Sequence, residues 1–153
     1  QWESKKKMVS DIQRLREETG AGIMECKRAL QDAGGDYTRA MALIRERGLL
    51  KAEKRADRQT GAGLLQAYVH NGRVGVLLDL RAETDFVANS EPFRELAHDL
   101  TLHISAMNPE TVPALLDQPY VKDPAQTVDQ VVKGVVARVG ENIQIARFTR
   151  YEL

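Results

Sequence analysis

The sequence predicts an α+β protein: an N-terminal three-helix bundle, then an antiparallel three-stranded sheet with helices packed on one face. Apolar residues recur at three- and four-residue spacing through residues 8–48 and 91–107, as in amphipathic helices. Two runs of alternating apolar residues flank Asn71-Gly72, a dipeptide typical of tight β-hairpins. A last alternating run, residues 142–151, supplies the third strand.

Composition places the chain among small soluble proteins. It has 153 residues, 42% of them hydrophobic, and no apolar run reaches the length that spans a bilayer, so no membrane partner is expected. The 22 basic residues balance 22 acidic ones, so we expect no dense basic patch and no direct nucleic-acid contact. The single cysteine fits a reducing cytosol, and residues 1–7 contain no secretory signal, so a cytoplasmic protein is expected.

Residues 8–48 are expected to form the three-helix module, and residues 1–7 to be a tail outside it. Gly20 and Gly48 are expected to end the first and third helices, because glycine adopts the left-handed conformation at low cost. Met24 and Lys27 should face solvent from the second helix. The stripes expected to face inward are Met8, Ile12 and Leu15, then Ile23, Cys26 and Leu30, then Tyr37, Ala40, Met41 and Ile44.

Residues 49–60 are charged and rich in helix-forming residues, which predicts a linker helix. We interpret it as mostly solvated, with contact between its basic residues and a partner as the alternative. Gly61 and Gly63 then mark the start of an α+β core domain, residues 61–153.

The core domain is predicted to run strand, strand, helix, helix, strand. Residues 91–107 form the first helix, and residues 109–124, which hold four of the five prolines, an irregular connection. The side chains expected on the inner face are Leu65, Ala67 and Val69 from the first strand, Val74, Val76, Leu78, Leu80 and Ala82 from the second, and Phe93, Leu96, Ala97, Leu100 and Ile104 from the helix.

A capping box predicts the start of the second core helix. Thr127 and Gln130 have the required spacing, and Gly140 is expected to end the helix. Its inward face is expected to carry Val128, Val131, Val135 and Val139. In the last strand the apolar alternation slips by one residue between Ile145 and Ala146, which indicates a β-bulge.

No group of residues predicts a catalytic, cofactor or metal site. His70, His98 and His103 lack metal-binding spacing, and His98 and His103 are expected on the surface. Cys26 lies on an inward stripe and is interpreted as a small buried hydrophobe. Asp85 has no second carboxylate at an acid–base spacing, so hydrolysis by Asp85 and a histidine is disfavoured. The chain is therefore expected to act by contact with another protein and not as an enzyme.

The run Thr84-Asp85-Phe86-Val87-Ala88 lies where a strand is expected to end and a helix to begin. An exposed phenylalanine there would present roughly 150–250 Å² of surface, suited to insertion into a partner. Alternatively, Phe86 folds back as the plug of its own junction, and the local pattern leaves both possibilities open.

Three segments of the chain, residues 15–30, 84–88 and 139–143, resemble bacterial translation elongation factor Ts and occur in that family's order. The resemblance covers residues 8–153. It implies a guanine-nucleotide exchange factor for the GTPase elongation factor Tu, with an N-terminal module similar to the ubiquitin-associated fold.

The resemblance also implies the residues that contact elongation factor Tu. The N-terminal module would grip the GTPase domain, while Asp85 and Phe86 would intrude near the magnesium site of the bound nucleotide. The whole implied set is Arg16, Ile23, Met24, Lys27, Thr84, Asp85, Phe86, Val87 and Ala88. For Ile23 this conflicts with the helical stripe, which places its side chain inward.

The chain looks like the short form of the family. It lacks the duplicated core half and the coiled-coil insertion of longer members, with only residues 109–124 in their place. Because the single core subdomain of short members can be completed by a second copy, a homodimer is a hypothesis. The rival interpretation is a non-enzymatic binding adaptor for protein or RNA, built from the same two domains.

Overall fold

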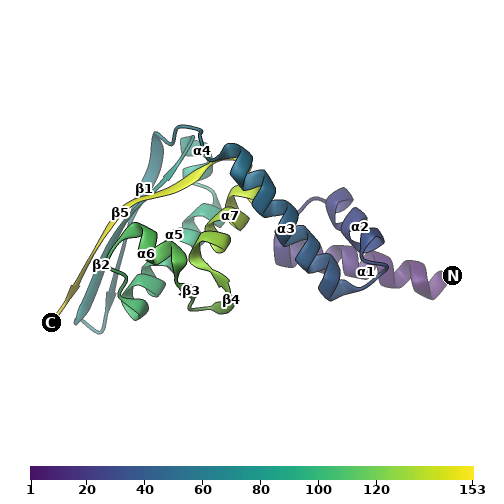
Figure 1. Cartoon of the computed structure of the whole chain (residues 1–153), viewed down its shortest axis with the longest axis horizontal. Helices are drawn as coiled ribbons and strands as arrows, with labels where there is room; N and C mark the ends of the chain where they lie inside the picture. The colour runs from purple at the N-terminus through teal and green to yellow at the C-terminus, as the bar shows by residue number, and fades with distance from the viewer. The chain divides into compact units, whose positions relative to one another are not determined.

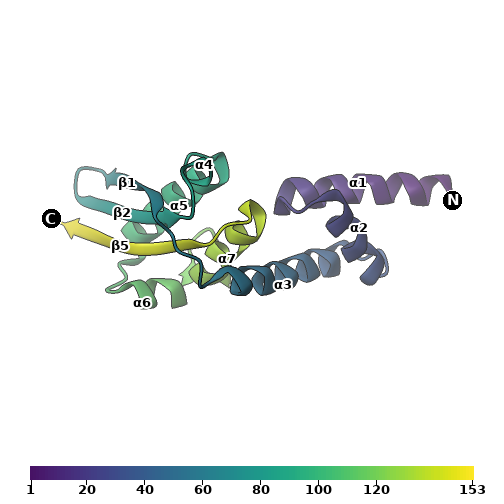
Figure 2. The same ribbon diagram turned by 90° about the horizontal axis from the view of Figure 1, so that it is seen from above.

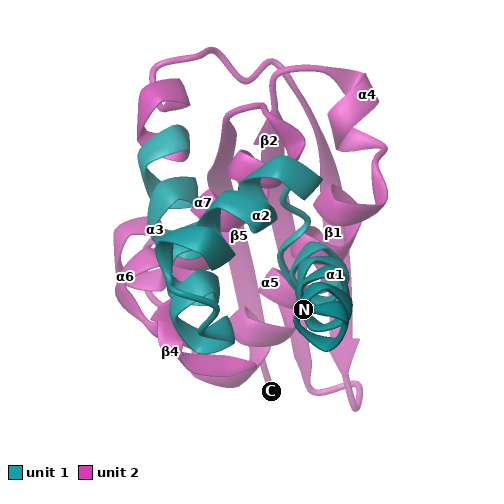
Figure 3. Ribbon diagram, turned by 90° about the vertical axis from the view of Figure 1, so that its right-hand side faces the viewer, with its two compact units in different colours: residues 1–51 teal, residues 52–153 magenta.

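The computed structural model describes residues 1–153 and divides into two compact units, residues 1–51 and 52–153 (Figures 1 and 3). The first unit is helical, and the second combines a sheet with helices, so the predicted α+β class is confirmed. No helix is both long enough and apolar enough to cross a membrane.

The first unit holds three helices around a small core. They are α1 (Trp2–Thr19), α2 (Ile23–Asp32) and α3 (Tyr37–Arg55), the last of which continues into the second unit. Gly20 ends α1 in the left-handed conformation, at φ 72°, as predicted. The core is made by Leu15, Cys26, Ala29, Leu30, Ala33 and Ala40.

Three expectations for the N-terminal half are wrong. Residues 2–7 are not a tail outside the helix but the first turns of α1. Two members of the expected inward stripes, Met8 and Ile23, are 39% and 53% exposed and do not face inward. Gly48 does not end α3, which runs on to Arg55, so residues 49–60 form no separate linker helix.

The continuation of α3 has a physical reason. A glycine inside a helix costs about 1 kcal/mol relative to alanine. The residues that follow Gly48 favour helix, and Ala52 is buried in the core of the second unit. Packing of this last turn offsets the free-energy cost of the glycine. The last turn of α3 therefore belongs to the second unit, which begins at residue 52.

The second unit is built on an antiparallel sheet of three strands in the order β1-β2-β5, as predicted. The strands are β1 (Ala62–His70), β2 (Val74–Ala82) and β5 (Ile143–Glu152). Asn71 and Gly72 have φ of 51° and 65°, the two positive values that a type I′ turn needs. The turn is closed by the Arg73 amide, which donates to the His70 carbonyl at 3.0 Å, and the first ladder pair beyond it is His70 with Val74.

The register corrects the inner face of β1. Leu65 pairs with Asp79, Ala67 with Leu77 and Val69 with Gly75, so all three side chains expected on the inner face lie instead on the face away from the helices. Leu65 and Val69 are each more than 60% exposed. Leu64, which pairs with the buried Leu80, packs against the core instead. Apolar residues occupy both phases of the alternation in β1, so the sequence pattern alone does not decide which face of the strand is buried.

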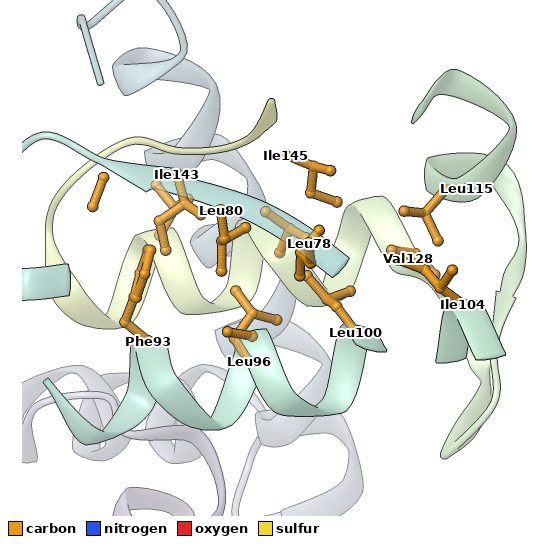
Figure 4. Close-up of a cluster of buried hydrophobic side chains, with 14 of the residues drawn as sticks. Leu78, Leu80, Phe93, Leu96, Leu100, Ile104, Leu115, Val128, Ile143 and Ile145 are labelled. Carbon is orange, nitrogen blue, oxygen red and sulfur yellow. The ribbon is translucent and has the colours of Figure 1, made fainter. Parts of the chain in front are cut away.

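Helices cover the other face of the sheet (Figures 1 and 2). The longest is α5 (Glu91–Met107). Further along the chain come α6 (Val112–Asp117) and α7 (Val128–Val139). All five predicted inward residues of α5 are buried. Figure 4 shows Phe93, Leu96 and Leu100 pointing from α5 toward the sheet. The other labelled members of this core are Leu78, Leu80, Ile104, Leu115, Val128, Ile143 and Ile145.

The connection between α5 and α7 is more ordered than expected. It contains α6 and a small two-stranded ribbon of β3 (Pro119–Tyr120) and β4 (Asp123–Thr127). His103 holds this ribbon in place and is fully buried, so its expected surface position is wrong. Its Nδ1 accepts from the Val121 amide at 3.1 Å, and its Nε2 lies 2.9 Å from Gln118 Oε1. Burial lowers the pKa of His103.

The predicted capping box and bulge are both present. The Gln130 amide donates to Thr127 Oγ1 at 3.2 Å, and the Thr127 amide donates to Gln130 Oε1 at 2.9 Å. The most buried valines of α7 are 128, 132 and 136, while the expected 131, 135 and 139 are partly buried beside them. In β5, Ile145 pairs with Leu80 and Arg147 with Asp79, so Ala146 is the extra, bulged residue.

Candidate functional site

A single helical turn, α4 (Asp85–Ala88), follows the end of β2. It lies at the opposite end of the sheet from the Asn71-Gly72 turn (Figures 1 and 2). Thr84 caps it, since its Oγ1 accepts from the Val87 amide at 3.4 Å. At the other end the Ser90 hydroxyl donates to the Val87 carbonyl at 2.6 Å. The turn is therefore held at both ends by side chains.

Burial divides α4 into an anchored half and a projecting half. Val87 and Ala88 are buried in the core of the second unit. Asp85 is exposed, and Phe86 is 87% exposed, the highest value among the large hydrophobic side chains. Phe86 is therefore not the plug of its own junction. Val87 and Ala88, included in the implied contact set, are anchors whose side chains are hidden from a partner.

The residue that holds Thr84 was missed by the sequence reasoning. Both donors of Thr84 reach Glu141: its amide donates to Oε1 at 3.0 Å and its hydroxyl to Oε2 at 2.7 Å. Glu141 directly follows Gly140, which ends α7 in the left-handed conformation. The only signal for it in the sequence was its place in the motif of residues 139–143.

The other four implied contact residues lie in the first unit. Arg16 is in the last turn of α1, and Ile23 and Met24 are in the first turn of α2, across the short connection after Gly20. Ile23 and Met24 are both more than half exposed. Lys27, one turn further along α2, is half-buried. These positions present an apolar pair with a basic residue on either side.

The exposed face of the sheet carries a second apolar surface, which we call the open face. Its large hydrophobic members are Leu65, Val69, Leu77 and Tyr151. Beside them Asp79 is buried beneath two arginines, with Arg81 Nε 2.6 Å from Oδ1 and Arg147 Nε 3.2 Å from Oδ2. The Arg81 guanidinium, assisted by Arg147, holds the pKa of the Asp79 carboxyl below its usual range.

Two possible kinds of site chemistry, metal binding and cysteine reactivity, can be compared with the structure. No group of three or more His, Cys, Asp or Glu side chains is placed to hold a metal ion. Cys26 is fully buried, as expected, and burial raises the pKa of its thiol. Such a thiol is a poor nucleophile, since the thiolate is the reactive form.

Comparison with known proteins identifies relatives along nearly the whole chain. The family model described as Elongation factor TS matches residues 5–114 and 83–153. An elongation factor Ts of Rubrobacter xylanophilus is 40% identical, with 95% of this chain and 98% of the relative aligned. Those of Thermotoga petrophila and, from the chloroplast, Cyanidioschyzon merolae are each 39% identical over 93% of this chain, with 94% and 91% of the relatives covered.

The relatives carry additional internal residues. The alignment to the Rubrobacter protein extends over 191 positions, 38 more than the 153 residues of this chain. Since nearly all of both chains is aligned, at least those 38 residues are internal to the relative and have no counterpart here. With matching models and relatives over almost its full length, the chain belongs to the elongation factor Ts family.

Proposed function

We propose that this chain is a cytoplasmic guanine-nucleotide exchange factor for elongation factor Tu, and that it promotes GDP release by inserting Asp85 and Phe86 near the magnesium and nucleotide site. The observation that carries the proposal is the exposed Phe86 beside the buried Val87 and Ala88. An aromatic ring that gains almost nothing from its own fold is available to a partner, and its backbone is held by the core. Family membership supports the choice of partner.

The mechanism requires contact and no acid–base chemistry. Factor and nucleotide compete through one coupling free energy, so a factor that weakens GDP binding is weakened equally by GDP. A tenfold change in affinity needs about 1.4 kcal/mol, and a buried aromatic hot spot contributes about 2–4 kcal/mol. Phe86 alone can therefore supply the needed free energy, while Asp85 would add a carboxylate that disturbs the coordination of the magnesium ion.

The first unit would supply affinity separately from the wedge. Arg16 lies in the last turn of α1, and Ile23, Met24 and Lys27 lie in the first turns of α2. Ile23 and Met24 expose apolar surface that a partner can bury, and the basic residues suit an acidic rim. Two linked contacts on one GTPase raise the overall affinity beyond that of either contact.

The direct test is release of labelled GDP from elongation factor Tu, chased with excess unlabelled GDP, with and without this chain. We expect the release rate to rise with the concentration of the chain and to saturate. Added magnesium should oppose the effect, because the wedge and the ion act on one site. No acceleration at any concentration of a folded chain would reject the proposal.

We further propose that the open face pairs with the open face of a second copy, making a homodimer. Leu65, Val69 and Leu77 are apolar, exposed and adjacent on β1 and β2, a surface that a monomer gains by covering. Light scattering across concentrations should then show a mass that doubles, and Leu77→Glu should prevent it. A strict monomer that is fully active in GDP release would reject the homodimer.

A further inference from the structure

Two segments far apart in sequence exchange hydrogen bonds behind the Asp85–Phe86 turn. The Glu141 carboxylate accepts both donors of Thr84, at 3.0 and 2.7 Å. In return, the Glu83 carboxylate accepts from the Asn142 amide at 2.8 Å. Residues 83–84 and residues 141–142 are thus locked together by two carboxylates, one from each segment.

This lock is itself fixed to the body of the second unit. The buried Asn142 side chain donates from Nδ2 to the carbonyls of Ala56 and Arg58, at 3.2 and 2.9 Å. Glu141 follows the left-handed Gly140 that ends α7, so its backbone position is defined by that helix. The carboxylate that holds Thr84 therefore has a rigid support of its own.

The short turn depends on such support. A helix of four residues is far too short to be stable alone, because nucleation is unfavourable. At its start the single side-chain bond is from the Val87 amide to Thr84 Oγ1, at 3.4 Å, a long bond. Because the Thr84 hydroxyl directs its hydrogen to Glu141, a lone pair of the same oxygen is left to accept from the Val87 amide. Glu141 therefore sets both the backbone and the hydroxyl of the residue from which Asp85 and Phe86 project.

We propose that Glu141 is a positioning residue for nucleotide exchange: by gripping Thr84 it sets the direction of the Asp85–Phe86 pair without touching the GTPase. The inference rests on the proposed exchange function and extends it to a residue outside the contact set. Misplacing a reacting or inserted group by about 1 Å can cost on the order of a hundredfold in rate. We expect Glu141→Gln, which keeps the shape and loses the charge and one acceptor, to lower the saturating rate of GDP release about ten- to a hundredfold.

The experiment compares four variants of the full chain. Glu141→Gln and Thr84→Val each break the grip, whereas Thr84→Ser retains both donors and should lose less than Thr84→Val. Glu110→Gln, an exposed carboxylate elsewhere in the same unit, is the matched control. Each variant is measured for amide hydrogen exchange at residues 85–88 without the GTPase, for thermal unfolding, and for GDP release as a function of factor concentration.

The expected pattern separates positioning from general stability. In Glu141→Gln the amides of Val87 and Ala88, both of which bond to Thr84, should exchange faster, and the saturating release rate should fall. The half-saturating concentration should change little, because the first unit still binds. A purely structural role would lower the melting temperature and leave the saturating rate of the folded protein unchanged. That result, or unchanged amide exchange, overturns the inference. If the wild-type chain does not stimulate release, the proposed function fails instead, and amide exchange alone decides whether Glu141 holds the turn.

Discussion

Truncating either of two phenylalanines to alanine should have opposite consequences. Phe86 keeps 87% of its surface exposed, so folding covers roughly an eighth of it. With about 200 Å² for an aromatic side chain and about 25 cal/mol per Å², Phe86→Ala should lower the free energy of unfolding by less than about 1 kcal/mol. Phe93 is fully buried in the core of the same unit. Phe93→Ala should therefore cost about 3–5 kcal/mol.

The effects of the two substitutions on GDP release should have the opposite ranking to their effects on stability. Removing the Phe86 ring removes a hot spot of about 2–4 kcal/mol from the complex, so stimulated GDP release should fall at least about tenfold while the chain still folds and binds. The folded fraction of Phe93→Ala should stimulate GDP release from elongation factor Tu at the wild-type rate. Urea titration monitored by circular dichroism gives the stability of both variants, and the GDP-release assay gives their activity at equal folded concentration.

One result would refute this reasoning directly. If Phe86→Ala is folded and stimulates release at the wild-type rate, the ring is not the wedge, whatever its exposure. A large loss of stability in Phe86→Ala would equally contradict the burial on which the estimate depends.

Three further predictions concern stability and are measured by urea or thermal unfolding. Burial lowers the pKa of His103 from 6.5, so below that pH the unfolded chain binds more protons than the folded one. The free energy of unfolding should therefore fall as the pH drops from about 6.5 through the lowered pKa, and His103→Gln should reduce this pH dependence. The pKa of Asp79 is lowered from 3.8, so its contribution to the free energy of unfolding is present above that pH and is lost as the pH falls through the folded pKa. Asp79→Asn should cost about 1 kcal/mol at neutral pH, since both arginines are partly solvated, and should abolish this loss of stability in acid. Gly134→Ala should stabilise α7 by about 0.5–1 kcal/mol, because an added Cβ meets open space, whereas Gly63→Ala should destabilise, because its Cβ would collide with a carbonyl of β2.

Local patterns predicted those elements in which one signal dominated. The five inward residues of α5 follow from helical spacing alone. The Asn71-Gly72 turn and the Thr127–Gln130 capping box depend on contacts within a few residues along the chain. The slip at Ala146 was visible because a bulge changes the alternation itself. The inner face of β1 was not predictable in this way, since apolar residues occupy both of its faces and the hairpin register decides between them.

The candidate site shows the same division. The position of the Asp85–Phe86 turn between strand and helix followed from the sequence. Its direction did not, because burial of Val87 and Ala88 decides that Phe86 points outward. The grip of Glu141 on Thr84 joins residues 57 positions apart, and no local pattern reports such a pair.

The bulge in β5 gives this strand an unusual tolerance to loss of genetic material. If the codon for Ala146 were deleted, Ile145 would still oppose Leu80 and Arg147 would still oppose Asp79, so the ladder would only straighten. Loss of the codon for Gln144 instead would bring Ala146 opposite Leu80 and turn Ile145 out to water. One position of this strand is thus spare, and its neighbours are not.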